Sequence, residues 1–164
     1  MIKRFFASLA LAFVLAVGSS VTLVASDISI TAANVVPSSA ARYSQQLAGV
    51  AITAGQVVYF DTTTGTVKLA KANLAPPGNS VFGIAMSNAS ANQPVVVCTY
   101  DPALAIGGTI AAGTLSWLSV VNAGGISSTG ADDVSGGTMT RIFIGVGTGS
   151  NKINFSPVAG GAVP

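Results

Sequence analysis

The sequence predicts an all-β domain, either a barrel or a sandwich, built from two similar units. After Asp27, short apolar segments recur between glycine-rich turns, and no amphipathic helical period is present. Strands spaced by roughly 8–12 residues with such turns are typical of barrels and sandwiches. The duplication is visible in residues 52–70 (ITAGQVVYFDTTTGTVKLA) and 110–128 (IAAGTLSWLSVVNAGGISS), which share one order of apolar, aromatic and turn residues.

The first unit contains four expected strands. The β-branched and aromatic residues at 56–60 predict a strand, and the sequence DTTTG at 61–65 predicts a hairpin turn in which Gly supplies a positive φ. A return strand follows at 66–70. After a break at the sequence APPGN, we expect two further strands at 81–86 and 94–100.

The second unit repeats this order. We expect a strand at 115–121, a turn at 122–125 and a return strand from Ile126. After a loop at 129–137, strands at 141–146 and 152–155 correspond to 81–86 and 94–98 of the first unit. The pseudo-repeats therefore span about residues 49–100 and 107–158.

The Ala-Gly pair that opens each unit has a physical role. Gly55 and Gly113 precede the first strand of their units, where a tight turn or bulge redirects the chain and Gly relieves a Cβ clash. Tyr59 and Trp117 then lie at the same point of each unit. We interpret them as core aromatics related by pseudo-symmetry.

The N-terminal 48 residues divide into two segments. Residues 1–26 carry two positive charges near their start, Lys3 and Arg4, and no further charge. This pattern is typical of a signal peptide. The same segment also fits a membrane anchor through residues 5–25, or an upstream start codon. Residues 27–48 form an arm or edge strand, in which 40–47 reads as a short helix or, by preference, a strand. The β domain then covers 49–164.

The composition argues against an enzyme and against a nucleic-acid-binding protein. Charged residues make up 7% of the chain, and there is no Glu and no His, so imidazole-based nucleophilic catalysis is excluded. Beyond residue 26, five basic side chains balance five aspartates, which gives no basic footprint for nucleic acid. Cys98 lies in an apolar run and is expected to be a buried, inert thiol.

The remaining polar motifs have structural explanations. Asp61 and Asp101 (which precedes Pro102) are expected to form turns. The pair Asp132-Asp133 lies in a Gly/Ser loop, which we interpret as solvated rather than as a calcium site. The sequence GVGTGS at 145–150 lacks the lysine of a phosphate-binding loop, so it predicts a glycine-rich turn. We therefore expect no catalytic residue, cofactor or metal.

From Asp27 onward the chain resembles the capsid decoration proteins of tailed phages, also called capsid cement proteins. The resemblance rests on ITAANVVPSSAARY, AITAGQVVYFDTTTGTVKLAKAN, VFGIAMSNASANQPVVV and IAAGTLSWLS, and it covers roughly residues 27–164. It implies a small β-barrel or β-tulip-like domain, commonly a homotrimer. It also implies a virion structural protein on the outer capsid surface that bridges and stabilises neighbouring major capsid subunits.

The same resemblance implies that the N-terminal arm contacts the capsid. The expected arm runs from Ser26 to Arg42, and its alternating start SDISIT suits strand addition to a partner sheet. Its expected contact residues are Ser26, Asp27, Ile28, Ile30, Val35, Val36 and Arg42. A second function class stays open, because such proteins do not normally begin with a secretory-looking segment. This alternative is a secreted or membrane-anchored bacterial surface protein, such as an adhesin-like module.

Overall fold

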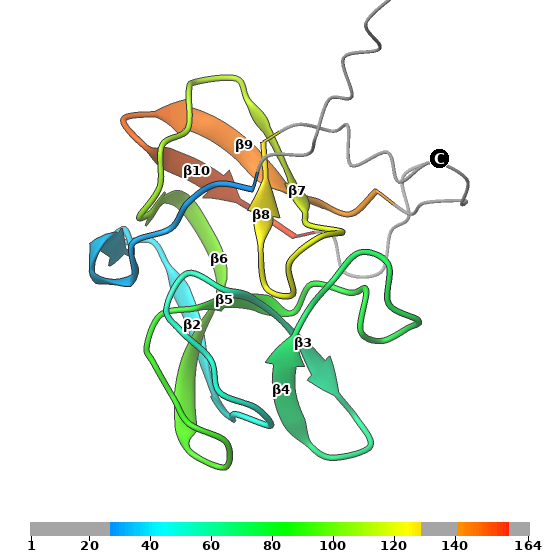
Figure 1. Cartoon of the computed structure of the whole chain (residues 1–164). Coiled ribbons are helices and arrows are strands. Elements are labelled where there is room, and N and C mark those ends of the chain that lie inside the picture. Colours follow the sequence, from blue (N-terminus) through cyan, green and yellow to red (C-terminus); the bar gives the residue numbers. More distant parts are fainter. Residues whose placement is uncertain (1–26, 129–140, 158–164) are drawn as a thin grey trace, which may run out of the picture.

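The chain folds into a curled antiparallel sheet that forms a half-barrel, as a computed structural model shows (Figure 1). The structure describes residues 27–128 and 141–157. Within these ranges nearly all regular structure is β, and the helical exception is a short 3-10 helix, Ala32–Asn34. The all-β prediction is therefore confirmed.

The strands follow the expected order, and the segment at 40–47 is a strand rather than a helix. Their bounds are β1 Val35–Val36, β2 Arg42–Leu47, β3 Val57–Asp61, β4 Thr66–Leu69, β5 Gly83–Ala85, β6 Pro94–Ile106, β7 Leu115–Leu118, β8 Ile126–Ser127, β9 Phe143–Gly149 and β10 Lys152–Phe155.

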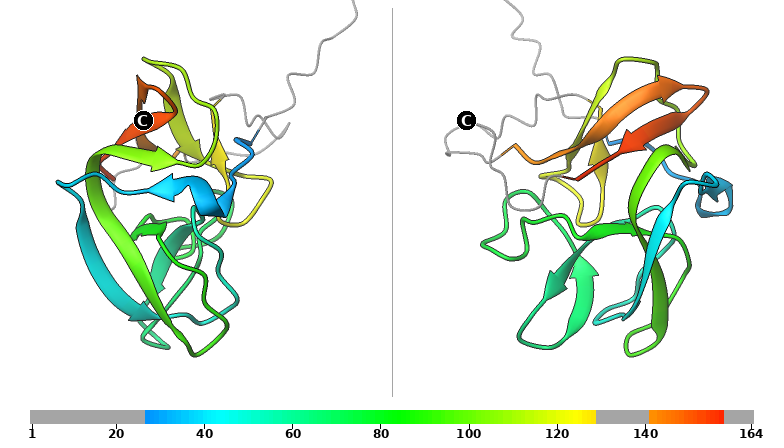
Figure 2. Two further views of the ribbon diagram at one scale, coloured as in Figure 1. Left: turned by 90° about the vertical axis from the view of Figure 1, so that its left-hand side faces the viewer. Right: turned by 180° about the vertical axis from the view of Figure 1, so that it is seen from behind.

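The long strand β6 connects the two halves of the molecule. Its first half pairs with β2 on one side and β5 on the other, and β5 continues through β3 to β4. Its second half pairs with β1 and β10, and β10 continues through β9 and β7 to β8. Figure 2 shows β6 running as one continuous ribbon from the lower half to the upper half.

Strand register confirms that the two units are built alike. Each unit opens with a turn in which Gly has a positive φ, +92° at Gly55 and +77° at Gly113. The Gly55 amide donates to the carbonyl of Ala85, and the Gly113 amide donates to that of Gly147, at 2.7 and 2.8 Å. Because these hydrogen bonds join non-local segments, the repeat extends beyond local sequence to the pairing of the strands.

One detail of the predicted repeat is wrong. Gly83 lies opposite Val58, and Gly145 lies opposite Ser116, so these two glycines are equivalent. The segment 81–86 therefore corresponds to 143–148 rather than to 141–146. The equivalence is set by the close approach of the backbones, because a Cβ on either glycine would strike a carbonyl oxygen of the next strand, at Cys98 or Asn154.

The aspartate at the centre of β6 was also misassigned to a turn. Asp101 is a fully buried strand residue, and its carboxylate accepts hydrogen bonds from the amides of Ser38 (2.7 Å) and Ala103 (2.9 Å) and from the Ser38 hydroxyl. β6 has one more residue than β10 at this point, which is a β-bulge that accommodates Pro102. The chain therefore continues where the sequence predicted a reversal.

The glycine-rich segment at 145–150 is likewise mostly strand. β9 extends to Gly149, and the reversal into β10 is made by Ser150 and Asn151, with φ of +54° and +61°. Two consecutive residues with positive φ are the requirement of a type I′ hairpin turn. Alternating Gly and apolar residues thus continue the ladder, and the turn itself uses the two polar residues after them.

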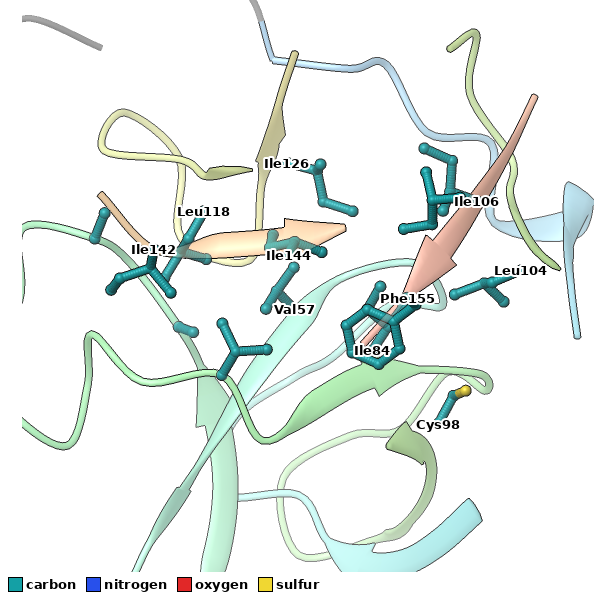
Figure 3. Close-up of a cluster of buried hydrophobic side chains, with 14 of the residues drawn as sticks. Val57, Ile84, Cys98, Leu104, Ile106, Leu118, Ile126, Ile142, Ile144 and Phe155 are labelled. Carbon is teal, nitrogen blue, oxygen red and sulfur yellow. The ribbon is translucent and has the colours of Figure 1, made fainter. Parts of the chain in front are cut away.

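Two apolar clusters stabilise the fold. The larger lies between the two halves and includes Ile84 of β5, Leu104 of β6 and Phe155 of β10, all fully buried (Figure 3). The smaller lies inside the first half and includes Val58, Val67 and Val97. The Cys98 side chain belongs to the larger cluster and its pKa is raised to about 11 by burial, as expected for an inert thiol.

Candidate interaction surface

The described residues contain no group of three or more His, Cys, Asp or Glu side chains able to hold a metal ion. Among the same residues, no helix is long and apolar enough to cross a membrane. Asp132 and Asp133 lie outside the described residues, as does Ser26. The surface features with functional potential are therefore the N-terminal arm and the sheet face next to it.

The arm, which we define as residues 27–41, runs across both halves of the domain. At its start Asp27 forms a bridge with Ser127, and the Ile28 amide donates to the Ile126 carbonyl at 2.7 Å. The Thr31 amide then donates to the Gly107 carbonyl at 2.8 Å. The arm therefore lies on its own domain along its whole length (Figure 2).

Three glycines of the domain lie directly against the arm. A Cβ on Gly55 would come within 2.5 Å of Ile30 Cγ2, and a Cβ on Gly108 would come within 2.8 Å of the Ser29 carbonyl oxygen. A Cβ on Gly107 would strike the Thr31 carbonyl. The absence of side chains at these positions lets the arm backbone approach the domain closely.

The arm is nevertheless a surface element. None of its residues is fully buried, although Ile28 and Ile30 pack partly against the larger core cluster. Two hollows adjoin it, with volumes of about 490 and 420 Å³, and both are lined in part by arm residues. The arm is thus held at the surface by hydrogen bonds to the domain and by the partial burial of Ile28 and Ile30.

The start of the arm is held by a buried polar contact. Oδ2 of Asp27 accepts hydrogen bonds from Ser119 Oγ at 3.0 Å and from Asn122 Nδ2 at 2.6 Å. Its other oxygen, Oδ1, is buried and forms no hydrogen bond. This carboxylate ties the arm to the turn between β7 and β8.

Exposed apolar side chains lie on the arm at Val36 and on the neighbouring segments of β2 and β6. Among the large apolar residues that the structure describes as exposed, six lie on β1, β2, the turn after β2, or β6: Val36, Tyr43, Leu47, Val50, Val96 and Tyr100. Together these six residues form what we call the apolar face. Within the described part of the chain, two cations adjoin this face: Arg42 lies over the Tyr100 ring at 5.6 Å from its centroid, and Lys68, which pairs with Asp61, lies beside Gly49. The face is therefore apolar and almost uncharged.

The predicted arm residues are only partly brought together. Asp27 and Ile28 lie over the second half. In contrast, Ile30 lies against Gly55 of the first unit, and Arg42 begins β2 in the first half. Val36 belongs to the apolar face, and Val35 is half-buried in β1. The sequence did not predict the other five residues of the apolar face, which are Tyr43, Leu47, Val50, Val96 and Tyr100. For the four on β2 and β6, the signal was the alternation within 42–47 and 94–100, which fits strands with one exposed apolar face.

The repeated aromatics differ in their surroundings. Tyr59 is half-buried and packs against the larger core cluster. Trp117 is half-buried and makes an edge-to-face contact with Phe143, with ring centroids 5.7 Å apart. Strand register places both at equivalent positions, opposite Lys68 and Ser127 respectively.

The hairpin turn at Asp61 has the expected turn chemistry. Asp61 Oδ1 accepts from the Thr63 amide at 2.9 Å, and Oδ2 accepts from Lys68 Nζ at 2.7 Å. The hydrogen bond from Lys68, with the help of that from Thr63, lowers the pKa of Asp61 to about 2. This carboxylate is therefore a structural part of the turn.

In comparisons with known proteins, the chain matches no family model and no curated sequence.

Proposed function

We propose that this protein is a virion structural protein that decorates the outside of an icosahedral capsid and bridges neighbouring major capsid subunits. On this proposal it acts as a binding protein without catalytic residues or cofactors. The observation that carries the proposal is the nearly uncharged apolar face beside a surface-lying arm, on a β domain whose sequence resembles capsid decoration proteins. The same resemblance supports a homotrimer.

The physical chemistry of this face suits repeated docking. A capsid offers many copies of one site, so a modest affinity per contact becomes strong attachment when several contacts act together. Exposed Tyr43 and Tyr100 are of the residue type enriched at the centres of protein interfaces. Of the two cations beside the face, Arg42 and Lys68, the second is paired with Asp61, so the face has little positive charge to attract the packaged nucleic acid.

A matched pair of variants tests the proposal. Val36, on the apolar face, is 54% exposed, and Val121, on the turn after β7, is 55% exposed. Val36→Asp introduces a charge into the proposed contact, whereas Val121→Asp introduces the same charge elsewhere with similar exposure. Burying an unpaired carboxylate is costly, so we expect Val36→Asp to weaken binding to particles at least about tenfold, or ~1.4 kcal/mol, and to lower occupancy below saturation accordingly.

The readout is the amount of protein that sediments with purified particles, measured for each variant by quantitative mass spectrometry. Equal occupancy of the two variants would contradict attachment through the apolar face. The alternative, a secreted or membrane-anchored surface protein, is supported by the apolar segment 1–26. Recovery of the native chain only in membranes or secreted material, and never in particles, would favour that alternative.

A further inference from the structure

β2 is an edge strand over most of its length. It pairs with β6 from Arg42 to Leu47, and among the described residues no strand forms a ladder along its other edge. The bridge from Ala48 to Val67 of β4 closes that edge immediately after Leu47. In the left view of Figure 2, β2 (cyan) runs along the outer margin of the fold.

This edge lacks the usual protection against pairing. Natural edge strands are commonly blocked by Pro, by Lys, by inward-pointing charges or by a covering segment. The β2 sequence RYSQQL contains neither Pro nor Lys, and its one charge, Arg42, is at the first residue. The segment from Tyr43 to Leu47 therefore forms a neutral edge of five residues, with β4 beside its Leu47 end.

The side chains of this edge are arranged symmetrically about Gln45. Tyr43, Gln45 and Leu47 are exposed on one face, and Tyr43 and Leu47 are each 49% exposed. Ser44 and Gln46 are half-buried on the other face, where Gln46 Nε2 donates to Ser44 Oγ at 2.7 Å. Gln45 lies at the centre of the free edge.

We propose that two copies of this chain pair through their β2 edges, antiparallel and around a two-fold axis at Gln45. Directly opposed residues of an antiparallel pair are related by such an axis. In this register Tyr43 of one copy lies opposite Leu47 of the second copy, and the reverse pair repeats the contact. Ser44 lies opposite Gln46 of the second copy. Each pair matches in character: apolar with apolar, and polar with polar.

The electrostatics favour a second copy as the occupant. In the register centred on Gln45, the two Arg42 residues are six strand positions apart, or roughly 20 Å at about 3.4 Å per residue. This separation exceeds the Debye length of about 8 Å at physiological salt, so their repulsion is screened. Aromatic–aliphatic cross-strand pairs add stability to such a ladder. The edge thus complements itself without a charged partner.

The contact goes beyond the proposed function, although Tyr43 and Leu47 belong both to this edge and to the apolar face. A two-fold contact gives even-numbered assemblies, whereas a cyclic trimer uses a different, head-to-tail contact. Its test therefore needs only the purified native protein in solution. The protein can fail to attach to capsids and still dimerise, or fail to dimerise and still attach to capsids. The two proposals can therefore fail separately.

Sedimentation equilibrium with two lysine variants tests the pairing. In the dimer, Gln45→Lys places two ammonium groups side by side, and we expect the dissociation constant to rise at least about tenfold. Thr62→Lys is the matched control, because Thr62 is also exposed but lies in the β3–β4 turn rather than on β2, and we expect the wild-type value. Thermal melts of both variants establish that each is folded.

A cross-linking measurement checks the register independently. Gln45→Cys should form a disulfide-linked dimer on mild oxidation, whereas Thr62→Cys should not, and Cys98 is fully buried. A wild-type protein that stays monomeric up to high micromolar concentration overturns the proposal, as expected if the edge receives a strand of another protein. A protein that forms trimers without any even-numbered species would also overturn the proposal. Equal cross-linking of the two cysteine variants would overturn it as well.

Discussion

The two repeated Gly turns provide a matched experiment on how the arm contributes to stability. Gly55 and Gly113 both have positive φ, at +92° and +77°. They differ in surroundings, because a Cβ on Gly55 would come within 2.5 Å of Ile30 Cγ2, whereas a Cβ on Gly113 would meet nothing within 4 Å. The same substitution to Ala therefore separates backbone strain from a clash with the arm.

The expected magnitudes follow from these two terms. A non-glycine residue in the left-handed region costs about 1–2 kcal/mol, so Gly113→Ala should lower the free energy of unfolding by about that amount. Gly55→Ala has the same backbone cost plus overpacking of about 1–3 kcal/mol. We therefore expect a total loss of about 2–5 kcal/mol for Gly55→Ala.

Urea denaturation of both variants measures these losses, and a third substitution identifies the clash. Ile30→Ala removes the side chain that the new Cβ would strike. In that background, Gly55→Ala should cost less than in the wild type and approach the cost of Gly113→Ala, because the 2.5 Å clash is gone and the 3.1 Å contact with Val35 Cγ2 remains. Equal losses for Gly55→Ala and Gly113→Ala in the wild-type background would refute the role of the arm contact.

Three further predictions concern buried polar groups. Ser116 is fully buried and its hydroxyl has no partner, so Ser116→Ala should raise the unfolding free energy by about 1 kcal/mol; a loss would show that the hydroxyl is bonded. Asp101→Ala removes the acceptor of two Ser38 donors and should cost about 3 kcal/mol, with faster hydrogen exchange at Ser38; unchanged exchange would contradict this. Burial raises the pKa of Cys98 to about 11, so a thiol reagent at pH 8 should label it only on unfolding, and rapid labelling of the native protein would contradict its burial.

The position of the apolar face shows why the candidate site was only partly predictable. The arm residues were identified because alternation and resemblance both mark residues 27–36. The face itself combines Tyr43 and Leu47 of β2 with Val96 and Tyr100 of β6. Strand alternation gives each strand an exposed side, but which strands lie next to each other depends on sheet pairing, which single-strand patterns do not specify.

Local chemistry by itself determined the strands, the hairpin turn at Asp61 and the two Gly turns, because β-branched runs and positive-φ positions act through neighbouring residues. Tertiary structure alone decided that β6 continues through Asp101. The buried carboxylate there is satisfied by Ser38, 63 residues away, and that partner exists only once the arm lies along β6. The same long-range pairing set the alignment of the repeats at Gly83 and Gly145, where two backbones approach too closely for any side chain.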